Sequence, residues 1–149
     1  MTIFRLCQKY RKRNKILFYF YFLWLRRLKF KYGMDISYRT SIGAGFYIGH
    51  FGGIVVHGDV IIGNNCNISQ GVTLGISNSG NVGTPIIKDN VFIGPNAGVF
   101  GSIEIGNNVT IGANSVVTKS IPSHSTVVSS AITVLDKDLS ENYIHNRYL

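Results

Sequence analysis

The chain has 149 residues, of which 45% are hydrophobic, and this is enough for one domain with a hydrophobic core. Its formal net charge of +8 is unevenly placed, because residues 1–31 hold ten of the fifteen Lys and Arg residues and no acidic residue. These bases accompany no nucleic-acid recognition motif, so we expect no nucleic-acid partner. The two cysteines, Cys7 and Cys66, lie far apart in unlike segments. This spacing favours a reduced cytoplasmic protein over a disulfide-stabilised one.

Residues 1–33 form the first predicted unit, a basic and aromatic helical arm. Residues 1–32 contain no Gly or Pro, so we expect one long helix or two close helices that end near Gly33. The fully apolar run 16–25 would be about 15 Å long as a helix, about half the hydrocarbon thickness of a bilayer, and should not span it. Two interpretations stay open. The aromatic face packs on the domain or on neighbouring subunits, or residues 1–31 make a peripheral contact with the inner face of an anionic membrane.

Residues 34–135 form the second predicted unit and repeat with a period of six. A period of six is typical of a parallel β-helix, in which three hexapeptides make one triangular coil of about eighteen residues. The recurring aliphatic residues should point inward and stack at about 4.8 Å from coil to coil. We expect about five coils, followed by a C-terminal tail over residues 136–149. The repeat slips by two residues after Val60 and is interrupted after Leu74, and its inward positions are Ile36, Ile42, Ile48, Ile54 and Val60; then Ile62, Ile68 and Leu74; then Ile87, Ile93, Val99, Ile105, Ile111 and Val117.

This pattern resembles the hexapeptide-repeat acyltransferases, so the resemblance implies an all-β, left-handed parallel β-helix behind the helical arm. Within it, "DISYRTSIGAGFYIGHFGGIVV" (35–56) is similar to the segment of serine acetyltransferases and related polysaccharide O-acetyltransferases that carries their catalytic histidine. The resemblance implies that His50 is the general base and that Asp35, fifteen residues upstream, is its carboxylate partner. His57 should also lie at an exposed corner, where ordinary solvation is the simpler interpretation.

A second segment, "IGANSVVTKSIP" (111–122), is similar to the coenzyme A-binding coil of sugar acetyltransferases. The resemblance implies that acetyl-CoA is the co-substrate. Its pantetheine arm would lie against Ala113 and, one coil earlier, Ala97, with Thr118 and Lys119 near the nucleotide. The usual continuation of this motif is replaced here by "SSAIT" (129–133).

The interruption "GISNSGNVGTPII" (75–87) bears on the acceptor. In serine acetyltransferases this loop carries an Arg-His pair before a proline, and an Asp precedes the catalytic histidine. Here Gly83 and Thr84 precede Pro85, and Gly49 precedes His50. A zwitterionic serine needs partners for both of its charges. The sequence therefore predicts a hydroxyl of a sugar or of a surface or capsular polysaccharide as the acceptor, with serine as the alternative.

Two further alternatives come from other classes of protein. A non-catalytic assembly module would leave the histidines without a role. A zinc hydratase needs three converging histidines, and His50, His57 and His124 do not offer that set, so we expect no metal. The resemblance also implies a homotrimer with active sites between subunits, since outward residues such as Phe46, Tyr47 and Phe51 would otherwise be exposed apolar patches.

Overall fold

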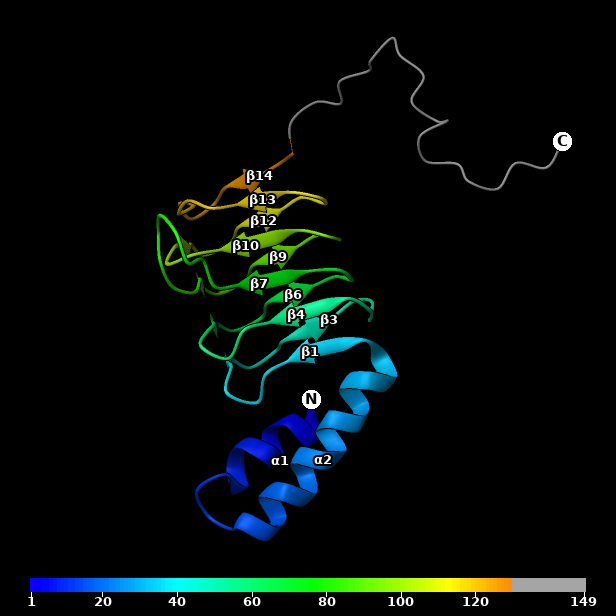
Figure 1. The fold of residues 1–149 in the computed structure, drawn as a ribbon. Helices are drawn as coiled ribbons and strands as arrows, with labels where there is room; N and C mark the ends of the chain where they lie inside the picture. The colour runs from blue at the N-terminus through cyan, green and yellow to red at the C-terminus, as the bar shows by residue number, and fades with distance from the viewer. Residues whose placement is uncertain (130–149) are drawn as a thin grey trace, which may run out of the picture.

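The computed structural model describes residues 1–129 and shows a helical arm at one end of a β-helix (Figure 1). The arm contains α1 (Thr2–Tyr10) and α2 (Lys15–Tyr32). Helix α2 begins at Asn14, whose Oδ1 accepts a hydrogen bond from the Leu17 N–H at 3.1 Å, and it ends at Gly33, which adopts a left-handed conformation with φ of 60°. The prediction of helices that end near Gly33 is confirmed. Residues 130–135 of the predicted β-helix and the predicted tail 136–149 lie outside the described residues.

The β-helix consists of short parallel strands that form three sheets, one on each side of a triangular prism. It is a parallel β-helix, as the repeat predicted, and it is left-handed, as the family resemblance implied. The first sheet contains β1 (Met34–Ile36), β4 (Ile54–Val56), β7 (Thr73–Gly75), β10 (Gly98–Phe100) and β13 (Val116–Val117). The second contains β2 (Ser41–Ile42), β5 (Ile61–Ile62), β8 (Ile86–Ile87) and β11 (Glu104–Ile105). The third contains β3 (Tyr47–Ile48), β6 (Asn67–Ile68), β9 (Phe92–Ile93), β12 (Thr110–Ile111) and β14 (Thr126–Val127).

The core is built from aliphatic side chains that stack from one coil to the next. In the first sheet Ile36 pairs with Val56, which pairs with Leu74. This register corrects the sequence analysis, which placed the two-residue slip after Val60. The two extra residues lie between Ile48 and Val56 instead, in the corner that carries His50. Ile54 and Val60 are fully buried all the same, because each lies two residues before an inward position and its side chain also turns into the prism.

Asparagine side chains order one edge of the prism, between the second and third sheets. Asn65, Asn90 and Asn108 all adopt left-handed backbone conformations there, with φ between 54° and 59°. Their amides form a ladder along the edge, because Asn65 Nδ2 donates to Asn90 Oδ1 at 3.3 Å and Asn90 Nδ2 donates to Asn108 Oδ1 at 3.1 Å. Asparagine tolerates this conformation better than other residues that have a side chain. The repeated Asn therefore fixes the corner and contributes to the stacking of the coils.

Helix α1 closes the open end of the prism. Phe4 is only 4% exposed and belongs to the same core cluster as Ile36 and Ile42. The Arg5 guanidinium donates to the Gly43 carbonyl oxygen at 2.8 Å, and Gln8 Nε2 donates to the Thr40 carbonyl oxygen at 2.9 Å. These bonds satisfy carbonyl groups of the first coil, which has no coil beneath it. The arm differs from the β-helix in amino-acid composition, and it also caps the end of the β-helix.

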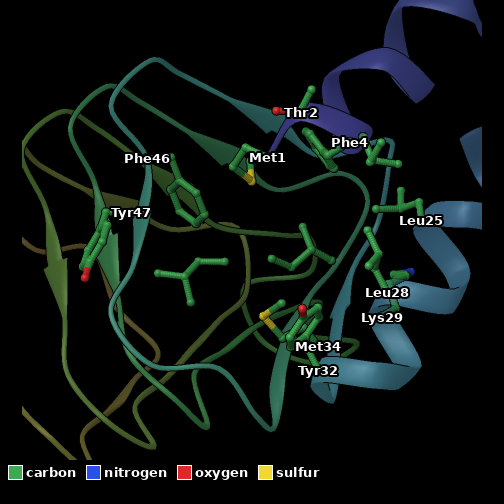
Figure 2. A pocket seen from close by; sticks show the side chains of 13 residues that line it. Met1, Thr2, Phe4, Leu25, Leu28, Lys29, Tyr32, Met34, Phe46 and Tyr47 are labelled. Carbon is green, nitrogen blue, oxygen red and sulfur yellow. The ribbon is translucent and has the colours of Figure 1, made fainter.

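A hollow of about 490 Å³ remains between the arm and the first coil (Figure 2). Its wall is almost entirely apolar, and Phe4, Leu25, Met34 and Phe46 contribute to it. His50 is not among its lining residues. Within residues 1–129, no helix combines the length and the apolar character needed to cross a membrane.

Candidate functional site

The candidate site begins at the corner between β3 and β4, where His50 is exposed. The chain turns through Gly52 and Gly53, whose φ angles of 106° and 65° are strongly disfavoured for residues with a side chain. Gly53 also lies against the next coil, since a Cβ at this residue would lie 3.4 Å from the Gly71 Cα. The sequence places glycine here because the longer corner must turn sharply while remaining stacked. This geometry presents the His50 imidazole on the outside of the prism.

In the following coils, the residues that correspond to His50 in the repeat lie along the same edge of the prism. Gln70, Pro95 and Ala113 each lie two residues after an inward aliphatic residue of the third sheet, as His50 does. Backbone hydrogen bonds join successive corners, including Gly71 N–H to the Gly52 carbonyl at 2.9 Å and Asn114 N–H to the Pro95 carbonyl at 2.8 Å. Three ladder steps of about 4.8 Å separate the His50 corner from Ala113, a span of about 14 Å. His50 and Ala113 therefore lie on one continuous edge of the molecule.

Gln70 is a residue that the sequence analysis missed. Its Oε1 atom is buried and has no hydrogen-bond partner among the described residues. A buried acceptor without a donor is costly, so a ligand that donates a hydrogen bond at this edge would stabilise it. The signal was present in the sequence, because Gln70 occupies the same repeat position as His50, one coil further on.

The carboxylate of Asp35 does not contact His50 in the structure. No hydrogen bond or ion pair joins the two side chains among residues 1–129, and Asp35 forms an ion pair with Lys29 of α2. Asp35 lies on the outer face of β1 and pairs in register with Val55 of β4. Asp35 therefore lies in the middle of a short strand, within a few residues of both edges of the first sheet. The His50 corner is at one of these edges, and the His57 corner is at the other.

His57 lies at the opposite edge of the first sheet, directly after β4. Its Nδ1 accepts a hydrogen bond from the Asp59 N–H at 3.3 Å, so in the neutral ring the proton is on Nε2. Arg39 donates to Asp59 at 2.5 Å, and the Thr84 hydroxyl donates to the Asp59 carbonyl oxygen at 3.0 Å. The interruption loop is thereby anchored at its end beside the Arg39–Asp59 pair.

A groove of about 520 Å³ runs over the first sheet from this edge. Both signs of charge line it, since it contains Lys29, Asp35 and Arg39, together with His57. The structure thus brings Asp35 and His57 into one groove, while His50 lies on the neighbouring edge. Charged partners for a zwitterion are present on this face, although Gly49, Gly83 and Thr84 supply none.

The residues predicted to hold coenzyme A divide into two groups. Ala113 is exposed on the edge of His50, whereas Thr118 and Lys119 are exposed after β13, on the edge of His57. Ala97 is fully buried in the core. Neither its methyl group nor its backbone is exposed to solvent, so the structure offers no surface of Ala97 to a ligand. The role of these four residues stays a prediction.

Neither cysteine is suited to act as a nucleophile. Burial raises the pKa of the Cys66 thiol, and the Sγ atom donates to the Lys88 carbonyl oxygen at 3.0 Å. Burial likewise raises the pKa of Cys7. Both thiols are free and remain protonated at neutral pH. Among residues 1–129, no three His, Cys, Asp or Glu side chains gather as a metal site would require.

Comparisons with known proteins show similarity to hexapeptide-repeat transferases and to serine acetyltransferases. Residues 84–119 match the family model "Bacterial transferase hexapeptide (six repeats)". A serine acetyltransferase of Buchnera aphidicola subsp. Schizaphis graminum is 42% identical over 73 residues, which cover 48% of this chain and 28% of that protein.

Two solved structures extend the similarity to the fold. Serine acetyltransferase isoform 3 of Entamoeba histolytica, in complex with cysteine, has a TM-score of 0.78 and 34% identity over 95% of this chain and 50% of its own. A serine acetyltransferase in complex with CoA has a TM-score of 0.72 and 31% identity over 83% of this chain and 50% of its own. The chain therefore spans about half the length of the solved relatives, and less of the curated one.

Proposed function

Because the chain is a hexapeptide-repeat β-helix protein similar to serine acetyltransferases, we propose that it is an acetyl-CoA-dependent O-acetyltransferase. The observation that carries the proposal is the shared edge of His50 and Ala113. A thioester held along this edge would present its acetyl group near an exposed imidazole. The relative in complex with CoA supports acetyl-CoA as the donor.

His50 is the group that would move the proton. The acceptor hydroxyl attacks the acetyl carbonyl carbon while the imidazole takes the hydroxyl proton. The new C–O bond forms, the C–S bond breaks, and the thiolate of coenzyme A leaves and receives a proton from the imidazolium. A neutral imidazole suits this exchange because one ring nitrogen can accept the proton and then return it to the leaving thiolate. No covalent acyl-enzyme is required.

Asp35 is proposed as the carboxylate that orients His50, but in the structure this carboxylate already has another partner. Its carboxylate pairs with Lys29 in the free protein, so it must share or leave this pair to accept a proton from the imidazole ring. A carboxylate in that position fixes the tautomer and stabilises the imidazolium. Lys29 therefore competes with His50 for Asp35.

Serine is the acceptor that the relatives favour over the polysaccharide hydroxyl expected from the sequence. The groove also supports serine, because it contains Arg39, a cation that can attract the serine carboxylate. A neutral sugar hydroxyl is the second candidate. The observation in its favour is the uncharged set Gly49, Gly83 and Thr84, in the positions where serine acetyltransferases carry charged or imidazole groups.

Outward apolar side chains support the further proposal of a homotrimer with sites between subunits. Each sheet has such residues on its outer face: Val55 and Val116 on the first, Ile61 and Ile86 on the second, and Tyr47 and Phe92 on the third, all between 36% and 71% exposed. A partner subunit that covered these faces would remove apolar area from water and close the open groove.

An acceptor screen tests the proposed function. Release of free coenzyme A from acetyl-CoA is measured with L-serine and with a panel of neutral mono- and oligosaccharides. We expect turnover with serine, and Arg39→Gln should raise the KM for serine while leaving coenzyme A affinity unchanged. Turnover only with sugars would show that serine is not the acceptor and would favour a neutral sugar hydroxyl. Absence of turnover with every acceptor, together with absence of acetyl-CoA binding by calorimetry, would favour the non-catalytic alternative.

A further inference from the structure

The outward face of α2 carries an apolar patch that no other part of residues 1–129 covers. None of the residues of α2 is fully buried. The patch side chains follow one another at helical spacing over the first ten residues of the helix, so they share one face. They are 45% to 82% exposed, and they are Ile16, Tyr19, Phe20, Leu23 and Trp24.

Positive charge surrounds this apolar patch. Exposed bases lie at both of its ends, with Lys12, Arg13 and Lys15 before it and Arg26, Arg27 and Lys31 after it. Residues 1–31 contain no acidic residue. Within the described residues, Lys29 is the base of the arm that forms an ion pair, and its partner is Asp35. Residues 1–129 therefore leave most of the charge of the arm without an ion-pair partner.

We propose that α2 lies flat on the surface of an anionic phospholipid bilayer, with the apolar patch among the acyl chains and the bases at the headgroups. An aromatic patch with flanking Lys and Arg is the composition that such interfacial helices need. At about 1.5 Å per residue, the ten residues that carry the patch extend about 15 Å, which is about half the thickness of the hydrocarbon layer and therefore too short to cross it.

Charge decides between a membrane and a second copy of the chain as the occupant. A self-interface through this patch would bring two arms together, each with ten bases and no acid. This arrangement is repulsive, because nothing in either arm offsets the like charges. An anionic surface offsets them, and each base near such a surface strengthens binding by about fivefold.

The position of the arm gives this docking a direction. The helices lie at the β1 end of the prism, and β14 lies at the opposite end (Figure 1). The ring of Phe51, in the His50 corner, makes an edge-to-face contact with Tyr32 of α2 at 5.4 Å between ring centroids. Docking would therefore hold the His50 corner close to the bilayer, and the coils would extend away from it.

Trp24 allows a direct test, because it is the single tryptophan of the chain. The 149-residue chain is titrated with vesicles of phosphatidylcholine alone and with vesicles that also contain the anionic lipid phosphatidylglycerol. We expect a blue shift of Trp24 emission with the anionic vesicles, its loss in high salt, and little change with phosphatidylcholine alone.

Variants assign the effect to the patch. In vesicle flotation, Phe20→Ser/Leu23→Ser should lose binding, while Val82→Ser/Val128→Ser, at exposed positions outside the arm, should retain it. Arg26→Gln/Arg27→Gln should weaken binding by about 25-fold, at about fivefold for each base, whereas Lys88→Gln should not. Circular dichroism checks that each variant is folded.

Two results would overturn the proposal. One is equal binding of the parent and Phe20→Ser/Leu23→Ser to anionic vesicles. The other is a combination of two observations: the parent protein does not bind vesicles, and Phe20→Ser/Leu23→Ser has a lower oligomeric mass than the parent in sedimentation experiments. That combination would assign the patch to contacts between copies of the chain.

Discussion

The cap formed by α1 can be tested with Phe4→Ala. Phe4 is 4% exposed and lies in the core cluster, and replacing a buried Phe with Ala typically costs about 3–5 kcal/mol. The hollow of about 490 Å³ borders the same side chain, so the site is already loosely packed on one side. We therefore expect the low end of the range, about 3 kcal/mol.

The assay is urea-induced unfolding of the parent and the variant at equal protein concentration, monitored by circular dichroism in the β region. Phe20→Ala is the matched control, because Phe20 is 57% exposed on α2 and its loss should change the free energy of unfolding by less than about 0.5 kcal/mol. Equal effects of the two substitutions would refute the cap, and the arm would then be an appendage of the β-helix.

Three further predictions concern the corners, a buried thiol and the assembly. Gly71→Ala should destabilise the protein more than Gly80→Ala: both glycines have a positive φ, but only at Gly71 would the new Cβ lie 2.0 Å from Asn96 Oδ1, while at Gly80 it meets nothing. Equal melting temperatures would contradict the close stacking. Burial keeps Cys66 protonated in the folded state while the unfolded thiol ionises near its ordinary pKa of 9.0, so stability should fall as pH rises through 9, and less steeply in Cys66→Ala. Identical slopes from pH 7 to 10.5 would remove Cys66 as a cause. Sedimentation equilibrium should give the mass of a trimer, and a stable monomer would contradict the proposed assembly.

The fold could be predicted because a repeat of six residues has one physical interpretation. Ile62, Ile68, Ile87 and Ile93 are each at most 3% exposed, as inward positions of a β-helix should be. The place of the two-residue slip could not be predicted, because Ile54 and Val60 also point inward from positions two residues before the stacked ones. Only the pairing of Ile36 with Val56 shows that the extra residues belong to the His50 corner.

The arm and the site show a different limit. Composition separates residues 1–33 from the repeat, yet composition could not show that Phe4 completes the core. For the site, spacing predicted that His50 lies at an exposed corner, and the resemblance supplied Ala113, which the structure also shows exposed. Whether two corners share an edge depends on the coil length. The pairing of Asp35 with Lys29 joins the arm to the β-helix, and neither residue alone predicts it.

The most direct test of the central claim is the acetyl-transfer rate of four variants, measured with saturating acetyl-CoA and the acceptor identified in the screen. His50→Ala should lower turnover by about 10²–10⁴-fold, the usual contribution of a general base, without changing coenzyme A affinity. Asp35→Asn should cost less, and the Asp35/His50 double variant should lose clearly less than the sum of the single losses. His57→Ala should retain most activity. A His57→Ala protein as inactive as His50→Ala would contradict the assignment of the base, and additive losses at Asp35 and His50 would exclude the dyad.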